Sequence, residues 1–225
     1  MSKLLKMSFM ALVVTGLMAL NASVTKADTV TFTTTGVFSA LSAVPGGTAT
    51  PTNGVPDSTA MFDDGSGNTI TIKFSGSNQS ILVPPQNGAV SLGIFTTAMT
   101  GAGTSGSGTL TLTINQTSPS SGQSDFVGTF DANFVFSGGV AGGGGTIQFQ
   151  PASVTIDGVT YALSNSGTVT ITVPPNNDGV FSTPGNSVEA TVSVANVPEP
   201  TSMLLLGSGL IGLAGAARRK LRSNN

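Results

Sequence analysis

Acidic side chains are the main candidates for chemistry, because the 225-residue chain has no cysteine, histidine or tryptophan. These absences exclude a thiol nucleophile, an imidazole base, a Ser-His-Asp triad and a zinc site of the usual ligand types. Two carboxylates could still hydrolyse a glycosidic bond, and Asp125 and Asp131 stand six residues apart in one expected strand. At ~3.3 Å per residue they would lie about 20 Å apart, too far to act as a pair. We therefore expect no catalytic residues, and a protein that is not an enzyme.

One acidic segment has the alternate spacing of a calcium loop. In Asp63–Asn68, three oxygen-bearing side chains stand at every second position: Asp64, Ser66 and Asn68. Ser75, however, occupies the twelfth position, where an EF-hand loop needs a glutamate. Asp, Gly, Ser and Asn are also the ordinary residues of a hairpin turn. The sequence therefore favours a turn, with a weak calcium site as the alternative, and predicts no other metal and no cofactor.

Three glycine-rich or proline-rich stretches are expected to be loops, because glycine has the widest range of backbone angles. They are Pro45–Asp57, Gly101–Gly108 and Gly138–Gly145. The last could resemble a phosphate-binding loop, but no Lys-Ser/Thr pair follows it and no helix is expected after it. We therefore expect a linker or a wide hairpin loop there.

The N-terminus is built like a secretory signal peptide over residues 1–27. Lys3 and Lys6 precede an apolar stretch from Met7 to Leu20, and small residues occupy positions 25 and 27. As a helix the stretch would span only about 21 Å, short of a ~30 Å bilayer core, which disfavours a permanent anchor. We expect signal peptidase to cleave between Ala27 and Asp28.

The C-terminus carries a second apolar segment, which prolines precede and basic residues follow. An uncharged helix is expected over about residues 202–217; the run from Thr201 to Ala217 would span about 26 Å as a helix, long enough to enter or thinly span a bilayer. Pro198, Glu199 and Pro200 precede it, and the prolines keep this stretch extended. Four basic residues follow it, and they favour retention of the tail in the cytoplasm: Arg218, Arg219, Lys220 and Arg222. The body of the protein is thus expected outside the membrane.

This arrangement resembles the PEP-CTERM sorting signal, with Pro198-Glu199-Pro200, a short apolar helix containing Gly207, Gly209 and Gly212, and an Arg-rich end. The resemblance covers residues 197–222. It implies that an exosortase-type enzyme of a Gram-negative, exopolysaccharide-producing bacterium reads the tripeptide while the helix holds the protein transiently in the membrane. A permanent single-pass anchor is the alternative reading. The module is also named "ice-binding protein C-terminal domain", which does not show that its bearers bind ice.

Residues 28–196 are expected to form one all-β extracellular domain. Apolar and Thr/Ser residues alternate with a period of two, and no stretch has a helical apolar stripe. Asp157-Gly158 fits the two-residue turn of a hairpin between residues 153 and 163. The remaining expected strands lie at 30–33, 69–74, 81–83, 90–96, 109–114, 126–136, 146–149, 168–173 and 188–194. This pattern predicts a β-sandwich of jelly-roll or Greek-key type; a β-solenoid is less favoured because no fixed period links the Thr-x-Thr runs.

The charge of this middle region limits its partners. Nine acidic residues face a single basic residue, Lys73, which gives a net charge near −8 and disfavours nucleic acid and anionic membrane surfaces. We expect an exported structural or adhesive protein of the cell surface or extracellular matrix, associated with exopolysaccharide.

Two binding functions are the alternatives. Ice binding would use flat rows of threonine, but the irregular spacing of the Thr-x-Thr runs does not support several rows side by side in a common register. Carbohydrate binding usually relies on aromatic rings, and Tyr161 is the only tyrosine.

Overall fold

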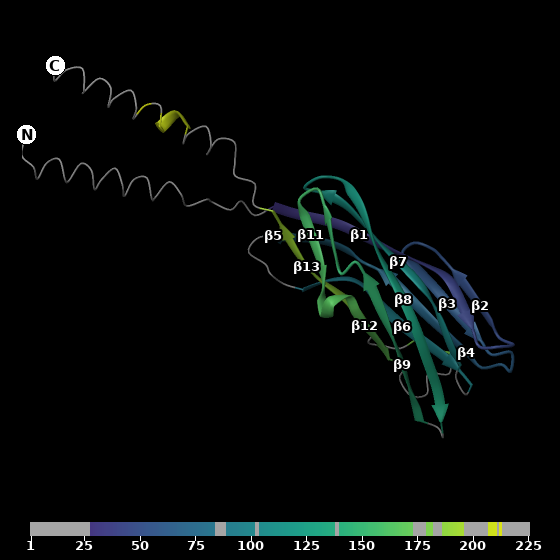
Figure 1. Cartoon of the computed structure of the whole chain (residues 1–225). Coiled ribbons are helices and arrows are strands. Elements are labelled where there is room, and N and C mark those ends of the chain that lie inside the picture. The colour runs from purple at the N-terminus through teal and green to yellow at the C-terminus, as the bar shows by residue number, and fades with distance from the viewer. Residues whose placement is uncertain are drawn as a thin grey trace, which may run out of the picture. The chain divides into compact units, whose positions relative to one another are not determined.

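The protein is described by a computed structural model that covers residues 28–83, 89–101, 104–137, 140–172, 179–181, 186–195, 207–210 and 212. The chain divides into two compact units, one of residues 27–195 and one that joins residues 1–26 to residues 196–225. All the described strands belong to the first unit (Figure 1). In the second unit, residues 207–210 and 212 are helical.

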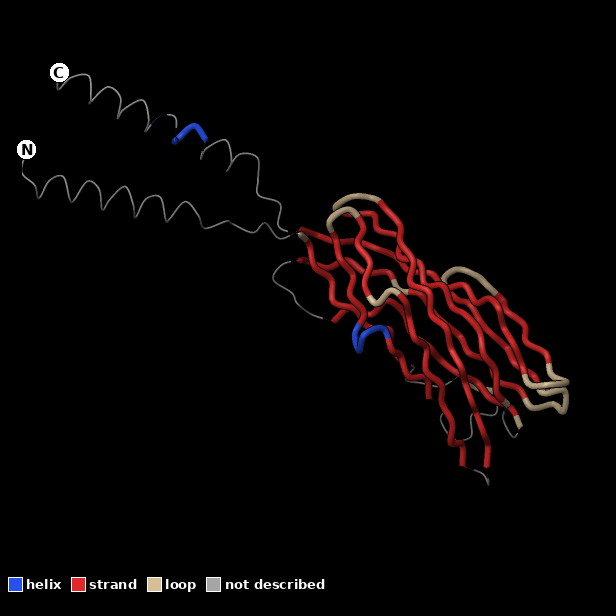
Figure 2. The backbone as a smooth tube through the Cα atoms, in the orientation of Figure 1, coloured by secondary structure: helices blue, strands red, loops and turns tan. Residues whose placement is uncertain are grey.

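The described residues of the first unit form strands and their connections, with one short 3-10 turn at Ser164–Gly167 among them, as the strand colouring shows (Figure 2). The strands in chain order are β1 (Asp28–Ala43), β2 (Thr48–Thr52), β3 (Asp57–Asp63), β4 (Thr69–Gly76), β5 (Asn78–Val83), β6 (Ala89–Thr100), β7 (Ser105–Ser118), β8 (Gly122–Ser137), β9 (Val140–Gln150), β10 (Ser153–Ile156), β11 (Val159–Leu163), β12 (Thr168–Thr172) and β13 (Asn186–Val194).

These strands form two antiparallel sheets. We call the six-stranded sheet, with the order β12-β9-β8-β7-β1-β5, the first sheet, and the seven-stranded sheet, β10-β11-β13-β6-β4-β3-β2, the second sheet. Each contains one meander, β7–β9 in the first and β2–β4 in the second, and the described strands pass seven times from one sheet to the other. The expected sandwich of two sheets is confirmed, and its assignment as jelly-roll or Greek-key stays a prediction.

The core lies between the sheets because alternate side chains of each strand point inward. On β7, Leu110, Leu112 and Ile114 are fully buried, whereas the threonines between them are not. Rings from opposite sheets meet edge to face: Phe32 contacts Tyr161 with ring centres 5.3 Å apart, and Phe62 meets Phe130 at 6.2 Å. The alternation of small polar and large apolar residues therefore sets which face of each strand is buried.

A few polar side chains enter this core, and Gln116, Ser58 and Tyr161 form hydrogen bonds there. The Tyr161 hydroxyl donates a 2.9 Å hydrogen bond to Oε1 of the buried Gln116, whose Nε2 donates to the Ser120 carbonyl. Since Tyr161 belongs to the second sheet and Gln116 to the first, this bond joins the two. The buried hydroxyl of Ser58, from β3, likewise donates to the Gly36 carbonyl of β1 at 2.6 Å.

Most of the expected strands are confirmed, including the hairpin. Ile156 pairs with Val159, and Asp157 and Gly158 between them have φ values of 43° and 82°, as a type I′ turn requires. The expected strand at 168–173 is described as far as Thr172.

The expectation that three stretches are loops throughout is wrong, because each contains a strand segment: β2 lies inside Pro45–Asp57, β7 begins at Ser105, and β9 begins at Val140. The glycines of β7 have a packing reason. A Cβ at Gly106 would lie 2.2 Å from Cδ1 of Phe62, and one at Gly108 would lie 3.0 Å from Cζ of Phe130. Glycine thus makes room there for rings of the core, instead of making the chain flexible.

The first unit begins and ends at the same end of its sandwich (Figure 1). Asp28, the first residue of β1, pairs with Val83, and Val194, the last residue of β13, pairs with Val159. The loops between β1 and β2, between β3 and β4, and between β6 and β7 lie at the opposite end. The acidic Asp63–Asn68 loop therefore lies at the end of the sandwich opposite to Asp28 and Val194, the residues at which β1 begins and β13 ends.

Candidate functional site

The predicted sorting residues lie outside the described part of the chain. This holds for Pro198, Glu199 and Pro200, and for the basic residues Arg218, Arg219, Lys220 and Arg222. Ala27 of the expected cleavage site is also outside it, whereas Asp28 is the first residue of β1. Searched over its described residues, the structure has no helix with the length and apolar character needed to cross a membrane.

The Asp63–Asn68 loop forms a closed turn between β3 and β4. Oδ1 of Asp64 accepts hydrogen bonds from the backbone N–H groups of Ser66 (2.7 Å) and Asn68 (3.2 Å), and Oδ2 accepts one from the Asn68 side-chain amide (2.6 Å). The side-chain bond from Asn68, followed by the backbone bond from Ser66, lowers the pKa of Asp64 below its usual value.

Hydrogen-bond donors of the loop itself occupy both carboxylate oxygens of Asp64, which a calcium ion would need as ligands. Ser66 meets Asp64 through its backbone nitrogen, and Asn68 through its side-chain amide as well. Among the described residues, no three acidic side chains gather at a point where they could hold a metal ion. The geometry is thus that of a self-capped turn.

A chemically uniform surface lies on the outer side of the first sheet, which we call the hydroxyl face. Its outward side chains are almost all Thr, Ser, Asn or Gln. Its described members are Asn78, Ser80 and Leu82 on β5; Thr29, Thr31, Thr33, Thr35, Val37 and Ser39 on β1; Thr109, Thr111, Thr113, Asn115 and Thr117 on β7; Gln123, Asp125, Val127 and Thr129 on β8; Thr146, Gln148 and Gln150 on β9; and Thr168, Thr170 and Thr172 on β12.

Hydroxyl and amide side chains of neighbouring strands lie opposite one another at some positions of this face. On the neighbouring strands β1 and β7, Thr35 is paired with Thr113 and Ser39 with Thr109. The second pair continues over β8 and β9, because Thr109 pairs with Thr129, which pairs with Gln148. Other threonines face different residues, as Thr111 faces Val37. The expectation that the irregular spacing does not support several threonine rows in a common register stays a prediction.

The hydroxyl face carries almost no charge. Among its described side chains, Asp125 is the sole charged group, and Thr113 donates a 2.6 Å hydrogen bond to its Oδ1. Val37 and Val127, which are 45% and 41% exposed, flank Thr111 and add apolar patches. The face thus offers hydroxyl and amide groups with interspersed methyl groups, a surface suited to uncharged hydroxylated ligands.

The outer side of the second sheet differs in charge. Lys73 on β4 lies 3.7 Å from the Asp57 carboxylate on β3, and its ammonium group is 5.1 Å from the centre of the Phe181 ring. Glu189 on β13 is exposed on this sheet as well. Among the described residues, the hydroxyl face therefore has fewer charged side chains than the outer side of the second sheet.

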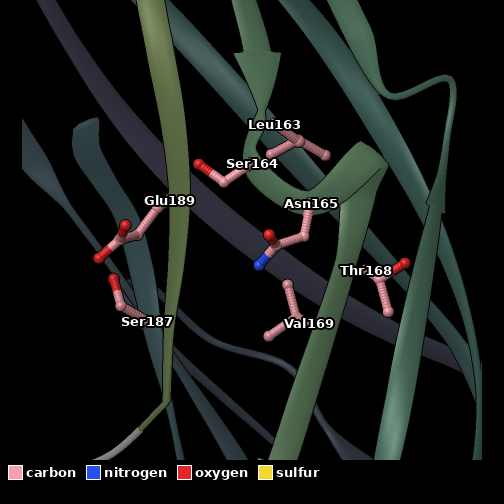
Figure 3. Close-up of a pocket in the computed structure, with 7 residues that line it drawn as sticks. All are labelled: Leu163, Ser164, Asn165, Thr168, Val169, Ser187 and Glu189. Carbon is pink, nitrogen blue, oxygen red and sulfur yellow. The ribbon is translucent and has the colours of Figure 1, made fainter. Parts of the chain in front are cut away.

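The described pockets are poor small-molecule sites. One lies at the turn between β11 and β12, where Asn165, Thr168, Ser187 and Glu189 line a space of about 80 Å³ (Figure 3). Ligand pockets usually measure about 300–1,000 Å³, so this one holds little more than water. A larger hollow of about 500 Å³, lined by residues such as Gly144, Thr146 and Thr170, is shallow and open. An extended ligand on a surface fits this body better than an enclosed one.

The two aspartates considered for glycoside hydrolysis do not form a pair. Asp125 and Asp131 both belong to β8, which continues through them with unbroken pairing to β7. Six residues of strand place their backbones about 20 Å apart, as expected. Asp125 is instead bonded within the hydroxyl face.

Residues 196–220 match the family model described as "PEP-CTERM protein-sorting motif". The chain carries a PEP-CTERM sorting signal. The match includes the predicted tripeptide and three of the four basic residues, through Lys220. A PEP-CTERM signal indicates an exported protein that an exosortase processes and that the membrane holds transiently. Neither the search of curated proteins nor that of solved structures finds a match for this PEP-CTERM protein.

Proposed function

We propose that this PEP-CTERM protein is a non-catalytic component of the outer surface or extracellular matrix of a Gram-negative bacterium, where it binds exopolysaccharide. The observation that carries the proposal is the hydroxyl face, a neutral Thr/Ser/Asn/Gln surface on a protein with an export signal. Signal peptidase releases the body at Asp28, and the tripeptide at 198–200 is the exosortase recognition site.

The side chains of the hydroxyl face and the negative charge of the body favour an uncharged polysaccharide as the partner. Hydroxyl and amide side chains donate and accept hydrogen bonds with sugar hydroxyls, and the methyl groups of Thr, Val37 and Val127 can contact the apolar edges of sugar rings. An acidic polymer would meet repulsion from a body with a net charge near −8 and only one lysine. The face is open, so it can bind a chain along its length.

A binding experiment on the exported protein tests this proposal. The protein is mixed with insoluble neutral β-glucan, with an insoluble uronic-acid polymer, and with the exopolysaccharide of its host, and the bound fraction is measured after sedimentation. We expect binding to the neutral polymers. A Thr111→Glu/Thr129→Glu variant should lose at least ten-fold in affinity, because it places two carboxylates on the hydroxyl face.

The matched control places the same charges on the second sheet. Thr71→Glu/Thr191→Glu changes two strand threonines whose partly exposed or exposed side chains lie outside the hydroxyl face, and it should bind like the unmodified protein. Equal losses in both variants would show a general charge effect, and the absence of binding to every polymer would refute the proposal.

The threonine rows of the neighbouring strands β1 and β7 are the observation that favours ice binding as a second candidate function. Each row presents hydroxyl and methyl groups at intervals of ~6.6–6.8 Å along its strand, and the two rows meet in register at Thr35 and Thr113. Neighbouring strands of a sheet, however, are rotated by roughly 20–25°, so three strands depart from a flat plane by ~40–50°. Polysaccharide chains can follow this twist and a crystal plane cannot. A thermal-hysteresis assay with the Thr111→Glu/Thr129→Glu variant separates the two functions.

A further inference from the structure

The edge strand β5 has backbone groups that point away from its neighbour β1. The Thr34 N–H donates to the Ser77 carbonyl at 2.9 Å, so every second pair from there, Phe32 with Gln79 and Val30 with Ile81, is a hydrogen-bonded pair, and Gln79 and Ile81 direct their backbone groups toward β1. The backbone groups of the alternate residues Asn78, Ser80 and Leu82 then point to the open side of the sheet. Within the described part of the chain they have no bonding partner on that side.

The other sheet edges are protected, each by a different device. β2 contains Pro51, which cannot donate to a further strand. β10 has only four residues and lies against β8, where Ile156 fills the space beside Gly122. At the end of β12, the Thr172 N–H donates to the Asn186 side chain and its carbonyl accepts a bond from Thr97.

β1 extends past the end of β5, and there the side chain of Asn53 bonds to its exposed backbone edge. Oδ1 of Asn53 accepts a bond from the Phe38 N–H at 2.8 Å, and Nδ2 of Asn53 donates to the Phe38 carbonyl at 3.0 Å. In β5, by contrast, no charged residue and no proline interrupts the sequence Asn-Gln-Ser-Ile-Leu-Val, and Leu82 is 55% exposed. Charged residues and proline are the usual devices that keep an edge strand from pairing with another chain.

We propose that β5 pairs antiparallel with β5 of a second copy of this chain, with Ser80 opposite Ser80. In this register Asn78 of each copy lies opposite Leu82 of the other. The three residues with free backbone groups then form hydrogen-bonded pairs, and the two strands can exchange six hydrogen bonds. Two identical strands that pair antiparallel about a central residue are related by a two-fold axis, as a closed dimer requires.

The pairing extends the first sheet across both copies. A two-fold axis through an antiparallel pair is perpendicular to the sheet, so the hydroxyl faces of the two copies lie on the same side and become continuous. The interface introduces no charge beside a charge, because Asn78–Val83 is uncharged. The two bodies repel each other at long range, so self-association should strengthen when salt screens their negative charge.

A single-cysteine experiment tests the register, since the chain has no natural cysteine. In the pair of Ser80 residues the Cα atoms are ~5.5 Å apart, within the range of a disulfide. We expect the full-length exported protein with Ser80→Cys to form a covalent dimer under mild oxidation. The matched control is Asn78→Cys, on the same strand and face. Its two copies would be four residues out of register, so it should cross-link at least ten-fold more slowly.

A second pair of variants tests the backbone contact without cysteine. Ser80→Pro removes an N–H that makes no bond to β1, so the sandwich tolerates it while the intermolecular ladder loses donors. Ser80→Ala keeps the N–H. Analytical ultracentrifugation should show a concentration-dependent dimer for the unmodified protein and Ser80→Ala, and a monomer for Ser80→Pro with unchanged circular dichroism. Monomers for all three proteins, or equal cross-linking of the two cysteine variants, would overturn the proposal.

Discussion

At the scale of single residues, Asp64, Asp125 and Tyr161 each form hydrogen bonds within the fold. Asp64 closes its own turn, and Asp125 bonds to Thr113. Burial raises the pKa of the Tyr161 hydroxyl, which remains a hydrogen-bond donor to Gln116. The functional interest of the body therefore lies in many similar side chains instead of a few special ones.

The Asp64 turn should open in acid. Hydrogen bonds from Asn68 and Ser66 hold the pKa of Asp64 below its usual value. A depressed folded-state pKa contributes stability above the unfolded pKa, and this contribution is lost as the pH falls through the folded value. We expect the amide NMR signals of Ser66 and Asn68 to shift with a midpoint below ~3.9. In Asp64→Asn this transition should be absent, and a midpoint above ~4 in the unmodified protein would contradict the assignment.

The bond between Tyr161 and Gln116 should matter for stability. Tyr161→Phe leaves Oε1 of the buried Gln116 without its donor, at a cost of about 1–3 kcal/mol in the free energy of unfolding. Urea denaturation measures this change. Thr155→Ala, which removes an exposed hydroxyl bond to Thr160 on the same sheet, should cost less than about 0.5 kcal/mol. Equal effects of the two changes would show that burial of the bond is unimportant.

At the scale of elements, glycine inside strands is a packing device. Gly106→Val would place side-chain atoms against the Phe62 ring, since even a Cβ at that position would lie 2.2 Å from it. Overpacking of this kind should lower the unfolding free energy by about 1–3 kcal/mol, measured by thermal or urea denaturation. Ser107→Val, at the adjacent position of β7 on the opposite face, is the control.

A compensating change makes the Gly106 prediction specific. Phe62→Leu shortens the opposing side chain, so it should recover part of the stability that Gly106→Val loses. Additive losses in the double variant would mean that the two residues do not interact in this way.

The sequence predicted most strands because their inward residues are large and apolar, as in β4 and β7. It did not predict β3, in which the inward residues include Ser58 and Ala60, or the first part of β9, where glycines obscure the alternation. The sorting signal was recognisable because it is continuous in sequence. The hydroxyl face was not, because the pairing of Thr35 with Thr113 depends on a contact between residues far apart in the chain.

At the scale of the whole molecule, the sorting signal and the β-sandwich lie in different parts of the chain. The signal, at residues 196–220, directs export and sorting, and the sandwich, within residues 27–195, carries the hydroxyl face. Because β1 begins and β13 ends at one end of the sandwich, both predicted cleavage events occur on chain segments that leave the body at the same end.

Replacement of the tripeptide tests the processing step. Pro198→Ala, Glu199→Ala and Pro200→Ala together should block exosortase processing, so that full-length protein accumulates in the membrane fraction. A blot of fractionated cells measures mass and location. The control changes Thr172, Asn186 and Ser187 of the sandwich to alanine and should be processed normally. If the unmodified protein keeps residues 203–222 in every fraction, the segment is a permanent anchor instead.

Lys73 limits where a trypsin-like protease can cut the β-sandwich. Trypsin-like proteases cut after lysine or arginine, and between Asp28 and Asn196 this lysine is the single such residue. It lies within β4, which is paired on both sides by β3 and β6, and its ammonium group is held near Asp57 and Phe181. A protease must pull that strand out of the sheet before it can cut. The folded body should therefore resist trypsin for hours and be cut into two fragments once urea unfolds it, as gel electrophoresis would show.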